Sequence, residues 1–496
     1  MSDAKRDIPR LLTGIEGLDT ILEGGLPNGG VYILQGPPGA GKTILANHVC
    51  FNHAAASGRA LYVTVLAESH ARMLAHLRRM AFFDPAAVPE RVYYVGAFSA
   101  LEEGGLAALT ALIRNELQRL GATLLVVDGL LSARESAGSD REFNKFIHGL
   151  QLIAASVGCV VLLLTNTQRT AEHFPEHTMV DGVLHLTDEL SNLRPLRHLQ
   201  VLKLRGSAPV RGLHTVKISD RGFEVRPRLE TRFGLRQFPE ETIAKGARLA
   251  FGIPELDAML HGGVRAGSLT MLVGSSGSGK SLLGMQFLAE GLRVDERVVY
   301  FGFYERPDAI VAKCDRIGNS WIRKGVEAGR AELLWRRPVE GIVDELGDSL
   351  IEAVRRNQAT RLVIDGINGF ELAADLKERV SDVYAAIAQE LEALHVTTMY
   401  TVELRSLYGP RIDVPINGMS AATQNIVLLR HVEHRARLLR ALAILKVRDS
   451  DYDAGVREIR FTDEGIRLLK TFDNEPQLIM GGGLAPPVDA DRPPKR

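Results

Sequence analysis

The sequence predicts an α/β protein of two tandem domains, each with a mostly parallel β-sheet, flanking helices and an antiparallel extension at one edge. The first observation is a pair of similar glycine-rich loops, whose lysines, Lys42 and Lys280, are 238 positions apart. The second is the alternation of short apolar runs with longer amphipathic stretches, which indicates parallel strands joined by crossover helices. The same order of landmarks in both halves indicates a duplicated domain.

The first loop has the form G-x-x-x-x-G-K-T and follows the apolar run 31–35. Its glycines leave backbone N–H groups free to surround an anion, its lysine adds positive charge, and its hydroxyl suits a magnesium ion. We expect a helix over 44–56 with its N-terminus facing the phosphates; the simpler alternative is a plain turn. The residues predicted to bind nucleotide are Gly36, Gly39, Ala40, Gly41, Lys42 and Thr43.

The second loop repeats this pattern after the apolar run 269–273. Two such octamers one domain length apart make a chance match a poor explanation. The residues predicted to bind nucleotide in this half are Gly274, Gly277, Ser278, Gly279, Lys280 and Ser281.

Further landmarks place the remaining elements and the boundaries. Apolar runs predict strands at 60–66, 92–96, 124–127 and 159–164, and amphipathic periodicity predicts helices at 101–120 and 141–157. Asp-x-Gly turns within 216–225 and 461–468 predict hairpins that extend each sheet with antiparallel strands. We expect a first domain at 1–230, a linker at 231–247, a second domain at 248–474 and a flexible tail at 475–496.

Composition argues against several classes of function. Lys and Arg total 60, as do Asp and Glu, so no overall basic field favours nucleic acid or an anionic membrane. The three cysteines lack metal-ligand spacing and are expected to be buried thiols. The sequence shows no apolar signal region and no apolar stretch long enough to cross a membrane, so we expect the chain to be soluble and cytoplasmic, with no membrane association.

Two aspartates are candidate magnesium ligands, together with the loop hydroxyls of Thr43 and Ser281. Asp128 and Asp365 each close an apolar run, so each carboxylate emerges where ligands bind in α/β sheets. Their distance in sequence from the loops fits a magnesium partner, and a helix-capping aspartate is the alternative. The predicted ligand is therefore Mg-ATP in both halves.

Hydrolysis also needs a group that orients or deprotonates the attacking water, and Glu68 and Glu305 follow the strands after each loop. The alternative for each is a surface glutamate. Two cation pairs each project from one face of a strand, which predicts an anion between the two cations. Since these strands come late in each domain, far in the chain from their own loop, we expect the anion to be the γ-phosphate of a neighbouring subunit. A solvated basic strand edge is the alternative for these pairs, which are Lys203 with Arg205 and Lys446 with Arg448.

These motifs resemble the KaiC family of RecA-like ATPases over nearly the whole chain. The resemblance rests on residues 13–19, both loops, both Asp-ended strands, 203–206, 446–448 and 426–433. It implies two tandem RecA-like P-loop domains, a homohexamer of two stacked rings with ATP at the subunit interfaces, and a possible protein signalling partner. It also implies slow hydrolysis in the first ring and Ser/Thr autokinase activity in the second.

The chain departs from the family pattern at several positions. The family's adjacent Glu-Glu pair is here Ala67-Glu68 and Tyr304-Glu305, so each half retains one carboxylate. The family's Ser-Thr phosphoacceptor pair is here Ser420-Ala421, which leaves Ser420 as the predicted acceptor. Two alternatives stay open: a RecA- or DnaB-like DNA-dependent motor, and an ATP-gated scaffold with little turnover.

Overall fold

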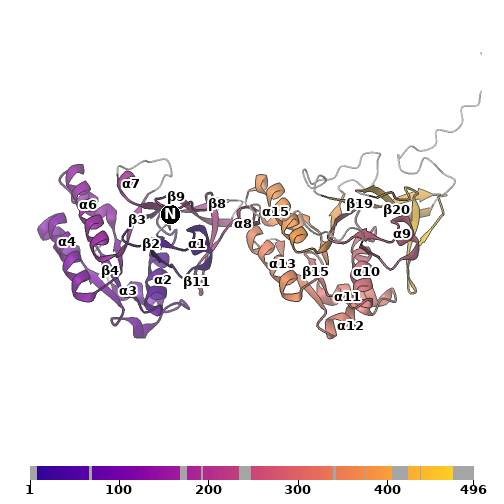
Figure 1. The fold of residues 1–496 in the computed structure, drawn as a ribbon, viewed down its shortest axis with the longest axis horizontal. Helices are drawn as coiled ribbons and strands as arrows, with labels where there is room; N and C mark the ends of the chain where they lie inside the picture. The colour runs from indigo at the N-terminus through magenta and orange to yellow at the C-terminus, as the bar shows by residue number, and fades with distance from the viewer. Residues whose placement is uncertain are drawn as a thin grey trace, which may run out of the picture. The chain divides into compact units, whose positions relative to one another are not determined.

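The computed structural model describes residues 8–65, 70–167, 176–191, 194–233, 247–338, 342–374, 376–404, 423–435, 437–448 and 450–472. The chain divides into two compact units, Met1–Arg228 and Leu229–Arg496. In each of them a central sheet is covered by helices (Figure 1).

The first unit contains a small ladder of β1 (Arg10–Leu11) and β2 (Leu26–Pro27) and one large sheet. The strands of the large sheet are β3 (Val31–Gly36), β4 (Ala60–Thr64), β5 (Val92–Gly96), β6 (Leu124–Asp128), β7 (Val160–Asn166), β8 (Gly182–Ser191), β9 (Arg194–Leu204), β10 (His214–Ser219) and β11 (Gly222–Arg226). Among the described residues their order is β11-β10-β9-β8-β3-β7-β6-β4-β5. Pairing is parallel from β5 to β8 and antiparallel from β8 to β11.

Helices cover both faces of this sheet because its central strands are apolar on both sides. The helices are α1 (Glu16–Ile21), α2 (Lys42–Ala55), α3 (His70–Leu77), α4 (Phe98–Leu120), α5 (Leu130–Glu135), α6 (Asp140–Val157) and α7 (Glu176–Met179). Along β3, Tyr32 and Leu34 pack with α1 and α2, whereas Val31 and Ile33 pack with α4 and α6. Helix α4 is kinked at Gly105, whose φ is 61°.

The second unit repeats this plan, with a small ladder of β12 (Arg248–Leu249) and β13 (Val264–Arg265). The strands of its large sheet are β14 (Leu269–Gly274), β15 (Val298–Gly302), β16 (Ala331–Trp335), β17 (Arg361–Asp365), β18 (Thr397–Glu403), β19 (Asn425–His434), β20 (Arg437–Val447), β21 (Arg457–Thr462) and β22 (Gly465–Leu469). Within the described ranges the order is β16-β15-β17-β18-β14-β19-β20-β21-β22, parallel up to β19 and antiparallel beyond it. Its helices are α8 (Leu229–Phe233), α9 (Pro254–Met259), α10 (Lys280–Arg293), α11 (Pro307–Arg316), α12 (Trp321–Glu327), α13 (Val343–Asn357), α14 (Asn368–Ala373) and α15 (Val380–Ala393).

Helix α8 opens the second unit and packs on α13 and α15. Its apolar residues Leu229 and Phe233 are buried in the same core as those helices, and Glu230 accepts a hydrogen bond of 2.9 Å from Arg379. The predicted linker at 231–247 thus begins inside α8. Its residues 234–246, like the predicted tail at 475–496, lie outside the described residues, so these boundaries stay predictions.

The predicted fold class, two mostly parallel sheets with antiparallel extensions, is confirmed. Both predicted hairpins are present, as β10–β11 and β21–β22. The three cysteines are buried, as expected. None of the helices in the described part of the chain has both the length and the hydropathy that crossing a bilayer demands.

Candidate functional site

The first glycine-rich loop joins β3 to α2 at the carboxyl edge of the parallel strands. Gly39 and Gly41 have φ of 85° and 98°, a backbone that L-residues rarely adopt. The loop curls so that the Lys42 ammonium donates hydrogen bonds of 2.8 Å and 2.9 Å to the carbonyls of Gly36 and Pro37. Burial lowers the pKa of Lys42, against the opposing effect of the Asp128 carboxylate.

The second loop, between β14 and α10, has the same geometry. The Lys280 ammonium donates hydrogen bonds of 2.8 Å to the carbonyls of Gly274 and Ser275, and burial lowers its pKa. Helices α2 and α10 both begin after a glycine, so the residue before each helix has no side chain to cap its first N–H groups. The N–H groups of a helix N-terminus and the positive end of the helix dipole suit an anion.

The two predicted magnesium aspartates lie at corresponding strand ends and are held by tyrosines. The Tyr62 hydroxyl donates to Asp128 Oδ2 at 2.7 Å, and the Tyr300 hydroxyl donates to Asp365 Oδ2 at 2.9 Å. Thr401 donates a further hydrogen bond of 2.7 Å to Asp365 Oδ1. Burial and then the adjacent carboxylate raise the pKa of both tyrosines, so they stay donors. Each carboxylate is thereby oriented by a fixed hydroxyl.

A cavity adjoins each loop. The first, of about 420 Å³, is lined by Lys42, Thr43 and Asp128 from the predicted set and by Asn166, His70 and His76. The second, of about 590 Å³, is lined by the loop residues and by three cations and three carboxylates, which are Lys280, Lys313, Arg316, Glu305, Asp365 and Glu403. The structure thus gathers the loop, the aspartate and a polar residue at the end of a neighbouring strand, Asn166 of β7 or Glu403 of β18, around one space in each unit.

These residues suit magnesium bound together with a nucleotide. Mg²⁺ prefers oxygen ligands and binds through one or two protein groups plus substrate phosphates. Each cavity offers a loop hydroxyl, Thr43 or Ser281, and one aspartate, Asp128 or Asp365. In the described part of the chain, His, Cys, Asp and Glu side chains form no cluster of three that would hold a metal by themselves.

Two predicted site residues lie outside the described residues, Glu68 in the segment 66–69 and Ser420 in 405–422. Glu305 is described and lines the second cavity. Its two carboxylate oxygens each accept a hydrogen bond of 2.6 Å from the Lys313 ammonium. No role was predicted for Lys313, because no motif contains it.

The first cation pair lies far from its own loop. Lys203 lies beside Val183 of β8, which in turn lies beside Ile33 of β3. The Arg205 N–H donates to the Asp181 carbonyl, and the Asp181 N–H donates to the carbonyl of the first residue of β3. Since β3 is six residues long, about 17 Å of strand separates the level of Arg205 from the loop, and about 10 Å separates the level of Lys203 from it. The Lys203 ammonium instead donates three hydrogen bonds to carbonyls at the end of α7, the shortest of 2.7 Å.

The second cation pair has the same position in its unit. The Arg448 N–H bonds to the carbonyl of Gln424, whose N–H bonds to Leu269, the first residue of β14. The Lys446 ammonium donates a hydrogen bond of 2.8 Å to the Thr423 carbonyl. Neither pair therefore lies at the cavity of its own unit.

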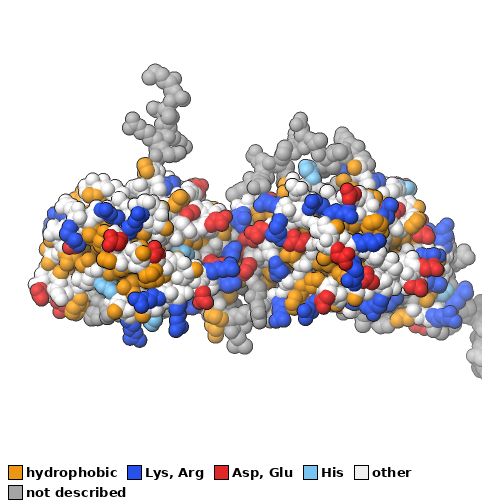
Figure 2. Space-filling model, turned by 90° about the horizontal axis from the view of Figure 1, so that it is seen from below, with side chains coloured by type: hydrophobic (Ala, Val, Ile, Leu, Met, Phe, Trp, Pro, Cys, Tyr) orange, Lys and Arg blue, Asp and Glu red, His pale blue; other side chains and the backbone are white. Residues whose placement is uncertain are grey.

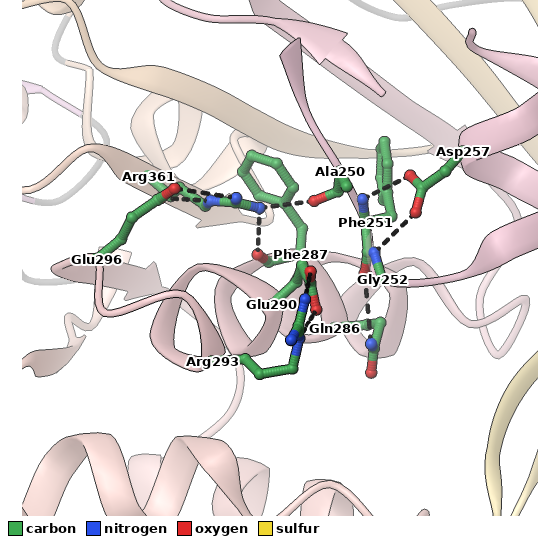
Figure 3. A network of polar contacts seen from close by, with 10 residues as sticks. All are labelled: Ala250, Phe251, Gly252, Asp257, Gln286, Phe287, Glu290, Arg293, Glu296 and Arg361. Atoms are coloured by element: carbon green, nitrogen blue, oxygen red, sulfur yellow. Dashed lines mark hydrogen bonds and ion pairs between the residues drawn. The ribbon is translucent and has the colours of Figure 1, made fainter. Parts of the chain in front are cut away.

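A buried polar network fixes the elements beneath the second loop (Figure 3). The Arg361 side chain at the start of β17 is 3% exposed and donates hydrogen bonds to Glu296 and to the carbonyls of Ala250 and Phe287. Its guanidinium also lies 4.5 Å from the Phe287 ring centre. Because Phe287 belongs to α10 and Asp365 ends β17, this network ties the loop helix to the strand that carries the aspartate.

Sequence reasoning missed the two tyrosines and Lys313. The tyrosines had a usable signal, since Tyr62 and Tyr300 are also 238 positions apart. Lys313 had none, since Ala75 stands 238 positions before it.

Comparison with known proteins agrees with this architecture. A family model described as "ATPase: KaiC" matches residues 11–230 and 249–472. The chain is 25% identical to the circadian clock oscillator protein KaiC of Picosynechococcus sp., over 98% of this chain and 94% of that protein. It is 25% identical to KaiC 1 of Synechocystis sp., over the same shares, and 24% identical to KaiC of Synechococcus elongatus, over 97% and 93%. With two matched repeats that cover most of its length, the chain belongs to the KaiC family of ATPases.

Proposed function

We propose that the chain is a hexameric signalling ATPase that binds Mg-ATP between subunits in both units and hydrolyses it slowly. The observation that carries this proposal is the position of the two cation pairs. Each pair lies outside the cavity of its own unit, with its arginine level with the start of the loop strand, so we infer that the phosphate it meets belongs to a neighbouring subunit. A cation supplied in this way stabilises charge that develops in the transition state.

We assign the residue roles from the residues that line the two cavities, and those of Glu68 and the cation pairs from the sequence pattern. The loop lysines bind the phosphates, the loop hydroxyls and the aspartates hold magnesium, and one glutamate in each unit orients the attacking water. In the first unit these residues are Lys42, Thr43, Asp128 and Glu68, and in the second Lys280, Ser281, Asp365 and Glu305. The neighbouring subunit contributes Lys203 and Arg205 to the first site and Lys446 and Arg448 to the second.

The test combines native mass spectrometry with an ATPase assay. Lys42→Ala should remove ATP from the first unit and weaken hexamer assembly, since the loop lysine offsets phosphate charge and the bound nucleotide bridges subunits. Lys377→Met, at an exposed lysine outside both cavities, is the control. A Lys42→Ala hexamer with unchanged ATP occupancy would refute the proposal.

A DNA motor would need a basic surface facing its strand. On the face shown in Figure 2, Lys and Arg side chains are interspersed with Asp and Glu on each unit. We therefore expect ATP turnover without DNA, unchanged by single-stranded DNA across a salt series. Turnover absent in both conditions would favour the scaffold alternative.

Autophosphorylation of Ser420 is the second part of the proposal, and it rests on the family resemblance. Thr423, three residues later, is fully buried; its hydroxyl shares a hydrogen bond of 2.5 Å with Tyr400. We expect at most one phosphate per chain in this region, on Ser420, absent in Ser420→Ala and in Glu305→Gln. Phosphate on Thr423 after incubation with Mg-ATP would show that the acceptor is misplaced, and an unphosphorylated wild type would remove the kinase.

A further inference from the structure

Glu305, just before α11, and Lys313, within that helix, form an ion pair beside the second loop. Both carboxylate oxygens of Glu305 lie 2.6 Å from the Lys313 ammonium, and the two side chains are 28% and 39% exposed. Both line the same cavity as Lys280. The residue proposed to act on the attacking water is therefore already bound to a cation.

This pairing makes Glu305 a poor general base. An ammonium that donates to both oxygens occupies one lone-pair site on each of them and holds the carboxylate in the orientation that suits the ammonium, not the attacking water. Glu305 can act efficiently only after Lys313 releases it.

A nucleotide bound in this cavity would give Lys313 a second partner, its terminal phosphate. Its three cations are formally balanced by three carboxylates, so the negative charge of an entering Mg-ATP has no excess cation to meet. The Lys280 ammonium is already hydrogen-bonded to loop carbonyls. A terminal phosphate offers Lys313 charge-assisted hydrogen bonds comparable with those it makes to Glu305.

The pair is a feature of the second unit. The first unit has Ala75 at the position 238 residues before Lys313, in α3. Its cavity is lined there by His70 and His76, and His70 Nε2 lies 2.8 Å from Thr64 Oγ1. Burial lowers the pKa of His70, which favours the neutral ring.

We propose that Lys313 is a positioning residue that senses the terminal phosphate at the second site. Without a triphosphate it holds Glu305; with ATP bound it pairs with the γ-phosphate and frees Glu305 to orient the attacking group. ADP lacks that phosphate and leaves the pair closed. This inference rests on the proposed function, because it assumes that nucleotide occupies the second cavity.

Tryptophan fluorescence can test it in the full chain. The only two tryptophans of the sequence, Trp321 and Trp335, both belong to the second unit, so a quench on titration reports that unit alone. The ligands are ADP and the non-hydrolysable imido analogue of ATP, each with magnesium. Lys313→Met should weaken binding of the analogue about tenfold or more while ADP binding changes less than about twofold. Lys313→Arg should retain most of the preference, and Lys377→Met, at an exposed lysine of the same unit, should not alter it.

Turnover gives a separate readout. Lys313→Met should raise KM for ATP by about the same factor with kcat at or above that of wild type, since Glu305 is no longer held. Equal weakening of ADP and analogue, or no weakening of either, would overturn the role of Lys313. Undiminished turnover in Glu305→Gln would instead contradict the proposed role of Glu305 as the base. The nucleotide preference of Lys313→Met would then still decide whether Lys313 senses the terminal phosphate.

Discussion

Alanine at two glycines of the second loop should separate backbone strain from steric overlap. Gly277 and Gly279 have φ of 73° and 103°, so alanine at either costs about 1–2 kcal/mol. A Cβ on Gly277 would meet nothing within 4 Å, whereas a Cβ on Gly279 would lie 2.2 Å from Cζ of Phe461. Overpacking of this kind adds about 1–3 kcal/mol. Gly279→Ala should therefore destabilise the unit about twice as much as Gly277→Ala and also displace the N-terminus of α10.

Thermal unfolding with and without Mg-ATP measures both effects. For a unit of this size each kcal/mol corresponds to roughly 2–4 °C in melting temperature. Gly277→Ala should keep the stabilisation by Mg-ATP, and Gly279→Ala should lose it at the second site. Phe461→Leu should reduce the cost of Gly279→Ala by about 1 kcal/mol in a double-mutant cycle. Equal losses for the two alanines, with no coupling to Phe461, would refute the steric argument.

Three further outcomes follow from the geometry. Tyr300→Phe, which removes the 2.9 Å donor to Asp365, should raise the magnesium concentration needed for ATP binding about tenfold; an unchanged magnesium titration would contradict this. Arg205→Ala should lower first-site turnover about a hundredfold with ATP affinity within about twofold, because a trans cation acts on the transition state; equal losses in both would give Arg205 a ground-state role. Burial lowers the pKa of His48 below its ordinary 6.5. Below that pH the unfolded chain binds more protons than the folded chain does, so the free energy of unfolding decreases as the pH decreases. His48→Gln, which copies the matching Gln286, should reduce the melting-temperature loss between about pH 7 and about pH 5; an unchanged loss would exclude His48.

Apolar runs predicted the parallel core because strands buried on both faces leave a simple signal. The run at 124–127 is β6, and Asp128 projects where the strand meets the cavity, as the pattern predicted. The edge strands were predicted from turn chemistry: Asp-x-Gly gives the tight Ser219–Gly222 turn between β10 and β11.

Long-range side-chain geometry was beyond the sequence. The alternation in 203–205 predicted two cations on one face of a strand. Only the register of β9 on β8 shows how far along the sheet these cations lie from the loop. The Lys313 contact with Glu305 depends on how α11 leaves β15, which no motif encodes. The internal repeat would have identified Tyr62 and Tyr300 had positions 238 apart been compared throughout.

The central claim, that one subunit's cations act on its neighbour's nucleotide, is tested most directly by mixing two inactive variants. Lys42→Ala lacks the loop lysine and Arg205→Ala lacks the trans cation; both also carry Glu305→Gln to silence the second site. In rings mixed at equal amounts, about one quarter of the interfaces should join an intact loop to an intact Arg205, and turnover should recover to about that fraction of the first-site rate. If native mass spectrometry shows mixed hexamers and turnover stays at the level of the parents, the cations act within one subunit and the account is wrong.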